Sequence, residues 1–233
     1  MRVNRTGDVY IIMLIILMLC YGSALVPYWK NPQIHYLGNT GIGGRIHSVL
    51  AEPFNAILEH KTYNGTNVRK MAFERVKTII HPSIPQRICD VCCGTGISTR
   101  AGHDVFPESD IIGLDTSLEM INMCDDSICY KNDNAEYFSY REKFDVISIM
   151  FALHEIPRKA RIGIIKNAKR NLKIGGICLI LDISPEYIVT PMMRGGEPYV
   201  DEYVQNIRDD LCEFKEETIV NGHLSRWILK NNS

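Results

Sequence analysis

The residues with the clearest chemical meaning are two acids on either side of a glycine turn. Asp90 comes four residues before Gly94, and Gly96 follows in the same turn. Glycine at such a turn lets the backbone approach a ligand closely, because it has no side chain and accepts positive φ. The second acid, Asp115, ends the apolar run that begins at Ile111. An acid at the end of a second strand accepts hydrogen bonds from ribose hydroxyls, so the spacing predicts a pocket for a ligand with a ribose.

The residues around the turn exclude two common phosphate-binding loops. A Walker-type loop requires Gly-Lys-Ser/Thr after four intervening residues, and a dinucleotide fingerprint requires a third small residue behind Gly-x-Gly. The turn at Gly94 has neither. We therefore expect a ligand in which a phosphate is not compulsory.

Three segments carry a resemblance to a known family. The run Asp90-Val91-Cys92-Cys93-Gly94-Thr95-Gly96 resembles the donor loop of class I S-adenosylmethionine-dependent methyltransferases, with Cys92 at the first glycine of the family pattern. Gly113 to Met120 resembles the ribose-binding segment, and Asn134-Ala135-Glu136 resembles the segment beside the adenine. The Cys-Cys-Gly-Thr-Gly form and the Asn-Ala-Glu are similar to the ubiquinone and menaquinone C-methyltransferase branch. The resemblance extends from about Arg87 to about Lys230.

This resemblance implies S-adenosyl-L-methionine as the cofactor and methyl donor. It assigns Asp115 to the ribose hydroxyls, Gly94 and Gly96 to close backbone approach, and Asp90 to ordering the loop and reaching the methionine amine. The carboxylate of the methionine group is expected at the free backbone N–H groups of the helix start near Ser98.

Further along the chain, the resemblance implies that Met120 and Ala135 flank the adenine, with Asn134 near its edge. The expected cofactor-binding residues are Asp90, Cys92, Gly94, Gly96, Asp115, Thr116, Met120, Asn134 and Ala135.

The prediction of the site that binds the methyl acceptor rests on fewer residues. Phe151 to Pro157 follows the fourth expected strand, whose end opens on the acceptor in this fold. His154 is the predicted catalytic base, since its ordinary pKa is near neutral. An orienting or packed histidine is the alternative, because methylation can proceed without a strong base. Asp182 is a second candidate for substrate contact, and Glu155 is expected at the surface or as a cap.

Strand and helix patterns alternate after Arg87 and predict a doubly wound, Rossmann-like α/β domain with a mostly parallel sheet. Among the expected helices, one begins at Ser117, which is its cap, and another covers Arg158–Leu172. The chain ends in a predicted hairpin, Glu216–Val220 and His223–Leu229, around a type I′ turn at Asn221-Gly222. The expected domain organisation is a hydrophobic segment at 1–26, an accessory helical region at 27–83 and the methyltransferase domain at 84–233.

The accessory region contains two amphipathic patterns, one through Val49, Phe54 and Ile57 and the other over Val68–Ile80. The resemblance implies that helices at this position lie over the cofactor site, as they commonly do in small methyltransferases. The glycine-rich run Gly38–Gly44 indicates a flexible turn, with a second ligand loop as the alternative. Candidate substrate contacts, each with a scaffold role as the alternative, are His47, Tyr63 and Arg69.

The N-terminus has an uncharged apolar run, Val9–Val26, preceded by Arg2 and Arg5. Its length predicts an N-terminal hydrophobic helix that is a single-pass membrane anchor. The alternative is an organellar or secretory targeting segment that is removed, because small residues follow the apolar stretch.

The composition limits the classes of partner that we expect the protein to bind. The chain has 26 basic and 27 acidic residues and no basic run, so no nucleic-acid partner is expected. Cys89 and Cys92 have the spacing of a zinc knuckle, but no second pair follows, so no metal is expected. The sequence predicts a methyltransferase that acts at a membrane on a small-molecule or lipid-like acceptor. The alternative is a non-catalytic, membrane-tethered module that binds S-adenosylmethionine as a sensor or scaffold.

Overall fold

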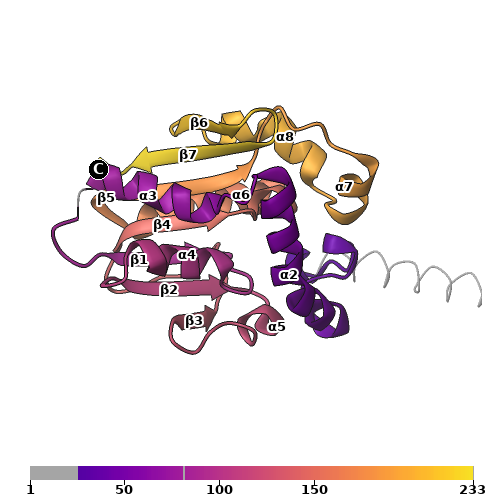
Figure 1. The fold of residues 1–233 in the computed structure, drawn as a ribbon, viewed down its shortest axis with the longest axis horizontal. Helices are drawn as coiled ribbons and strands as arrows, with labels where there is room; N and C mark the ends of the chain where they lie inside the picture. The colour runs from indigo at the N-terminus through magenta and orange to yellow at the C-terminus, as the bar shows by residue number, and fades with distance from the viewer. Residues whose placement is uncertain (1–25, 81, 233) are drawn as a thin grey trace, which may run out of the picture.

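The fold is built on one mixed sheet. The computed structural model describes residues 26–80 and 82–232. Seven strands pair in the order β3-β2-β1-β4-β5-β7-β6 (Figure 1). Strands β1 to β5 are parallel, and β7 is antiparallel to both β5 and β6. The predicted α/β fold with a terminal antiparallel hairpin is therefore confirmed.

The strands follow the apolar and β-branched runs of the sequence. They are β1 (Arg87–Val91), β2 (Asp110–Asp115), β3 (Cys129–Asn132), β4 (Phe144–Met150), β5 (Leu172–Ile183), β6 (Lys215–Val220) and β7 (Leu224–Lys230). The α-helices are α2 (Gly41–Thr62), α3 (Val68–Ile80), α4 (Ile97–Val105), α5 (Leu118–Ile121), α6 (Arg158–Asn171), α7 (Pro191–Gly196) and α8 (Val200–Asp210). Short 3₁₀ turns are η1 (Tyr28–Lys30), η2 (Ile34–Tyr36) and η3 (Leu153–Glu155).

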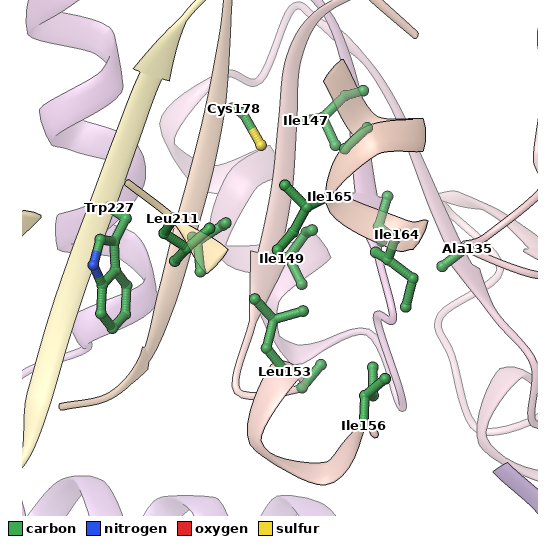
Figure 2. Close-up of a cluster of buried hydrophobic side chains, with 14 of the residues drawn as sticks. Ala135, Ile147, Ile149, Leu153, Ile156, Ile164, Ile165, Cys178, Leu211 and Trp227 are labelled. Carbon is green, nitrogen blue, oxygen red and sulfur yellow. The ribbon is translucent and has the colours of Figure 1, made fainter. Parts of the chain in front are cut away.

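Helices cover both faces of the sheet, which explains why the central strands read as continuous apolar runs. On one face, Ile147 and Ile149 of β4 belong to a core that includes Ile164 of α6 and Trp227 of β7 (Figure 2). On the other face, Val146 belongs to a second core with side chains of α3 and α4. Alternate residues of one strand thus enter opposite cores, as the two-residue period of a strand requires.

Two predicted boundaries differ from the structure. The helix predicted over Arg158–Leu172 ends at Asn171, and β5 begins directly at Leu172. The terminal turn is not type I′, because that turn needs positive φ at both central residues and only Gly222 has it, at 65°. The hydrogen bond from His223 N to Val220 O nevertheless closes the hairpin.

Both amphipathic patterns of the accessory region form helices, but the apolar stripe of the first, α2, does not face the core, whereas α3 enters it. Val49, Phe54 and Ile57 are exposed, whereas Gly44 and Ser48 are buried. The glycine-rich run enters the first turn of α2, where a Cβ at Gly43 would lie 1.7 Å from the carbonyl oxygen of Leu37. These glycines therefore permit close packing at the helix start.

The predicted single-pass membrane anchor is corrected by the structure. Within 26–80 and 82–232, no helix is both long and apolar enough to cross a membrane. The predicted N-terminal hydrophobic helix falls almost entirely on residues 1–25, which lie outside the described residues.

Candidate functional site

The donor loop begins at the carboxyl end of β1, where Asp90 is fully buried. Its Oδ2 accepts hydrogen bonds from Ser98 Oγ at 2.6 Å and Thr99 Oγ1 at 2.7 Å, and its Oδ1 accepts one from Ser148 Oγ at 2.7 Å. Burial raises the pKa of Asp90, while these hydroxyls and the Arg69 guanidinium lower it in part. Asp90 thereby ties β1 to the start of α4 and to β4, which is the loop-ordering part of its predicted role.

The loop turns through three residues with positive φ: Cys92 at 59°, Gly94 at 54° and Gly96 at 80°. A Cβ at Gly96 would lie 2.5 Å from Tyr130 Oη, whereas a Cβ at Gly94 would meet nothing within 4 Å. Gly96 is thus required by internal packing. The open space over Gly94 is where a ligand can approach the backbone, and Cys92 keeps the left-handed conformation although it is not glycine.

Asp115 joins the loop to β2. Its Oδ2 accepts a hydrogen bond from Gly94 N at 2.9 Å, and its Oδ1 accepts one from Ser117 N at 2.8 Å. Burial raises the pKa of Asp115 to about 6, although these two backbone donors act in the opposite direction. Both oxygens keep lone pairs for a further donor, since each carboxylate oxygen accepts two hydrogen bonds.

The remaining predicted cofactor residues lie at the ends of β2 and β3. Thr116 directly follows Asp115, and Met120 is buried in α5 behind the Ser117 cap. Asn134 accepts a hydrogen bond from Glu136 N through its side chain at 2.8 Å, and the neighbouring Ala135 is buried. Because β2 and β3 are adjacent parallel strands, these residues and the glycine turn share one edge of the sheet.

The segment before α2 closes over this edge, which sequence reasoning did not identify. Ser117 Oγ donates a hydrogen bond to Asn39 O, and Gly41 N donates one to Glu119 Oε1 at 2.6 Å. Burial raises the pKa of Tyr28 in η1, and Cys92 of the donor loop acts in the same direction. Each of these two hydrogen bonds joins residues 78 positions apart in the chain, so no local pattern in the sequence indicates them.

On the acceptor side, His154 is buried and its Nδ1 lies 2.6 Å from Asp182 Oδ1. Burial alone would lower the pKa of His154, but the Asp182 carboxylate raises it to about 9. At neutral pH the ring is therefore held mainly as an imidazolium. It is better suited to hold an anionic oxygen than to take up a proton from an acceptor.

Glu155 is not a surface or capping residue as expected. Its side chain is only 17% exposed, and its Oε1 lies 2.9 Å from His35 Nε2. The same imidazole contacts Glu197 through Nδ1 at 2.7 Å. Burial would lower the pKa of His35, but the two carboxylates raise it to about 10. Sequence reasoning missed His35 and Glu197, because nothing nearby in the chain marks either as part of a site.

Comparison with known proteins finds a family model that matches part of the chain. Residues 88–176, which hold the glycine turn, Asp115 and the Asn134 segment, match a family described as a methyltransferase domain. This part of the chain is therefore similar to a methyltransferase domain. With the relatives and the solved structure described below, this similarity confirms the predicted resemblance to class I methyltransferases, which use S-adenosyl-L-methionine as the methyl donor.

Relatives of the methyltransferase domain belong to the predicted branch. A demethylmenaquinone methyltransferase of Lactobacillus johnsonii is 29% identical over 160 residues, which cover 64% of this chain and 62% of that protein. A demethylmenaquinone methyltransferase of Thermotoga maritima is 27% identical over 48% of this chain and 50% of the relative. The chain thus spans about half to two thirds of the length of these relatives.

A solved structure shares the fold at low identity. An N-methyltransferase of Bradyrhizobium japonicum, solved with S-adenosyl-L-homocysteine, is 16% identical with a TM-score of 0.51, over 71% of this chain and 87% of that chain. At this identity the likeness concerns the fold of the methyltransferase domain.

The three candidate substrate contacts of the accessory region differ in their surroundings. Arg69 is buried, pairs with Glu59 at 3.3 Å and lies over the Phe151 ring at 4.4 Å from its centroid. Tyr63 contacts His223, and the His47 ring lies 4.2 Å from the His35 ring. Arg69 and His47 therefore adjoin the acceptor side of the methyltransferase domain, while Tyr63 contacts the terminal hairpin.

Proposed function

We propose that the protein transfers a methyl group from S-adenosyl-L-methionine to a small-molecule acceptor related to quinone precursors. The observation that carries the proposal is the arrangement of Gly94 and Asp115. The backbone N–H of an open, positive-φ glycine donates to the acid at the end of β2, within the residues that match a methyltransferase domain. The structural relative solved with S-adenosyl-L-homocysteine, which is the demethylated donor, supports this choice of cofactor.

In this proposal the donor side positions the cofactor and makes no covalent bond to it. Asp115 accepts hydrogen bonds from the ribose hydroxyls of S-adenosyl-L-methionine, and the open space over the Gly94 backbone lets the cofactor approach closely. Asp90 orders the loop, because its carboxylate is engaged by three internal hydroxyls. Met120 and Ala135 flank the adenine, with Asn134 near its edge. The methyl group leaves a sulfonium by in-line displacement, so alignment and exclusion of water supply most of the catalysis.

The acceptor lies against the segment that follows β4. His154 is fixed there by Asp182, and an imidazolium in this position would stabilise an acceptor that reacts as a phenolate or enolate. The names of the relatives support a quinone precursor, since each of them acts on demethylmenaquinone. The segment 185–199, which includes α7, covers the acceptor side in this proposal.

The identity of the methyl donor is tested by calorimetric titration of the full chain with S-adenosyl-L-methionine, and the titration is repeated on Asp115→Ala. We expect binding at one site and a loss of affinity of at least about tenfold in the variant, since a charge-assisted hydrogen bond contributes about 1.5–3 kcal/mol. Absence of binding, or equal affinity of the variant, would refute the donor assignment.

The acceptor is tested by transfer of labelled methyl from the donor into purified demethylmenaquinol, a phospholipid and a sterol. Labelled product from the quinol alone supports the proposed class. Product from another acceptor overturns the class but retains the activity. Donor binding without product from any of the three favours the non-catalytic sensor.

A further inference from the structure

Three side chains from distant parts of the chain converge beside the acceptor side. His35 comes from η2, Glu155 from η3, and Glu197 directly follows α7. One ligand atom from each, a ring nitrogen or a carboxylate oxygen, lies within 4.8 Å of the other two. In the described part of the chain, no other group of three or more His, Cys, Asp or Glu residues meets this condition.

The cluster has a buried oxygen with nothing to bind. Glu197 is 5% exposed, and its Oε2 has no hydrogen-bond partner among the described residues. An unpaired carboxylate oxygen in such a position costs free energy, because it has lost water without gaining a donor. A bound cation is one partner that satisfies such an oxygen, as a water molecule also can.

The charges around the cluster also leave room for a cation. Two carboxylates, Glu155 and Glu197, face the single imidazole of His35. The next imidazole, that of His154, lies 3.9 Å from Glu155 but is already paired with Asp182 at 2.6 Å. His47 lies beside His35, with 4.2 Å between the ring centroids, but its Nδ1 contacts the neutral side chain of Asn39 at 3.0 Å. The five groups that contact one another as ion pairs are three carboxylates and two imidazoles.

The packing of η2 on α7 holds two of the three side chains at a fixed separation. Tyr36 Oη donates a hydrogen bond to Met192 O at 2.6 Å. The Tyr36 ring fills the space over Gly195, where a Cβ would lie 2.2 Å from its Oη. His35 directly precedes Tyr36, and Glu197 directly follows Gly196, whose Cβ would also lie 2.9 Å from the Tyr36 ring. These contacts bring His35 and Glu197 together.

We propose that His35, Glu155 and Glu197 bind a divalent first-row transition metal ion, with Zn²⁺ the best match. Metal binding would release to solvent the proton that His35 shares with the two carboxylates, since a histidine ligand is neutral. One imidazole nitrogen and two carboxylate oxygens suit Zn²⁺ and Mn²⁺ better than Ca²⁺, which takes oxygen ligands alone. Three protein ligands leave a coordination position for water or for an oxygen of the acceptor. The metal site stands on the three side chains, and only a role in orienting the acceptor rests on the proposed function.

The test is calorimetric titration of the chelator-treated full chain with ZnCl₂, and separately with MnCl₂. We expect one equivalent of each ion to bind. Glu197→Gln, Glu155→Gln and His35→Asn are each expected to weaken binding by about 10-fold to 100-fold or more, the range found when even supporting groups of a metal site are lost. Asparagine is chosen at His35 because the φ of 52° there is tolerated by that residue. Glu186→Gln, an exposed acid paired with Arg208, is the matched control and should bind as the parent does.

Mn²⁺ separates this site from the cysteines, because thiolates favour Zn²⁺ over Mn²⁺. Thermal unfolding gives a second readout, since an ion that binds only the folded state raises the melting temperature of the parent and not of Glu197→Gln. Failure of both ions to bind at one equivalent, or equal affinity in the three variants and the control, would overturn the site. Donor affinity measured in the same variants should be unchanged, so loss of the metal proposal leaves the donor assignment standing.

Discussion

His154 and Asp182 form a buried pair across the carboxyl ends of two adjacent strands, with His154 Nδ1 2.6 Å from Asp182 Oδ1. The other carboxylate oxygen of Asp182 accepts a hydrogen bond from Leu153 N at 2.8 Å. One acid at the end of β5 therefore fixes both the ring and the backbone of the segment after β4. The orientation of His154 toward an acceptor depends on this acid.

The first prediction concerns this pair. Asp182→Asn leaves an imidazolium buried without its counter-charge, and we expect a loss of about 3 kcal/mol in the free energy of unfolding. The double variant Asp182→Asn with His154→Gln should lose less than the sum of the single losses, because the two groups interact directly. Urea unfolding of the parent, the two single variants and the double variant gives the four values. Strict additivity would contradict a direct interaction.

Local signals in the sequence were sufficient for the strands and for the donor loop. The apolar runs at Arg87–Val91 and Asp110–Asp115 and the cap at Ser117 have the structure that their patterns predict. Each of these features depends on residues close together in the chain. The helix ending at Asn171 and the turn at Gly222 differ in detail, since boundaries and turn types depend on neighbouring strands.

The acceptor side was less predictable because its contacts join distant segments. Glu155 looks like a surface residue from its neighbours, and its partner His35 is 120 positions away in the chain. The apolar positions of α2 likewise predict a buried face, but the helix packs through Gly44 and Ser48. Periodicity identifies an apolar face without showing whether any other element covers it.

The second prediction separates backbone strain from ligand approach at Gly94. Gly94→Ala and Gly175→Ala both place a Cβ on a residue with positive φ and open space around it. Each should lower the free energy of unfolding by about 1–2 kcal/mol. Only Gly94→Ala should also weaken binding of S-adenosyl-L-methionine, because Gly175 lies in β5, away from the donor loop. Titration calorimetry and urea unfolding on both variants check this, and equal donor affinity in the two would contradict close approach at Gly94.

The third prediction concerns Asp90 as the centre of three buried hydrogen bonds. Asp90→Ala leaves the hydroxyls of Ser98, Thr99 and Ser148 without this acceptor. With about 1 kcal/mol for each, we expect a loss of about 3 kcal/mol or more in the free energy of unfolding. Ser148→Ala removes one bond and should cost about 1 kcal/mol. If Asp90→Ala is no less stable than Ser148→Ala in urea, Asp90 does not order the loop.

The fourth prediction uses the ionisation of Asp115. Burial raises its pKa to about 6, so the carboxylate that is proposed to accept the ribose hydroxyls becomes protonated as the pH falls through that value. Donor affinity should therefore fall between about pH 7.5 and about pH 5, by at most tenfold per unit below about pH 6. The effect on stability has the opposite sign. A carboxyl whose folded-state pKa is raised binds its proton more readily when folded, so its contribution to the free energy of unfolding declines as the pH rises from about 4 to about 6.

Two substitutions on the same strand isolate this effect. Asp115→Asn cannot ionise, and its weaker donor binding should not vary over that pH range. Asp110→Asn, at the other end of β2, should keep both the parent affinity and its pH dependence, because Asp110 is exposed and pairs with Arg87 far from the loop. Calorimetric titration of the three proteins at a series of pH values gives the comparison. A decline that persists in Asp115→Asn would mean that another group controls donor binding, and it would remove the support that the pH dependence gives to the ribose contact.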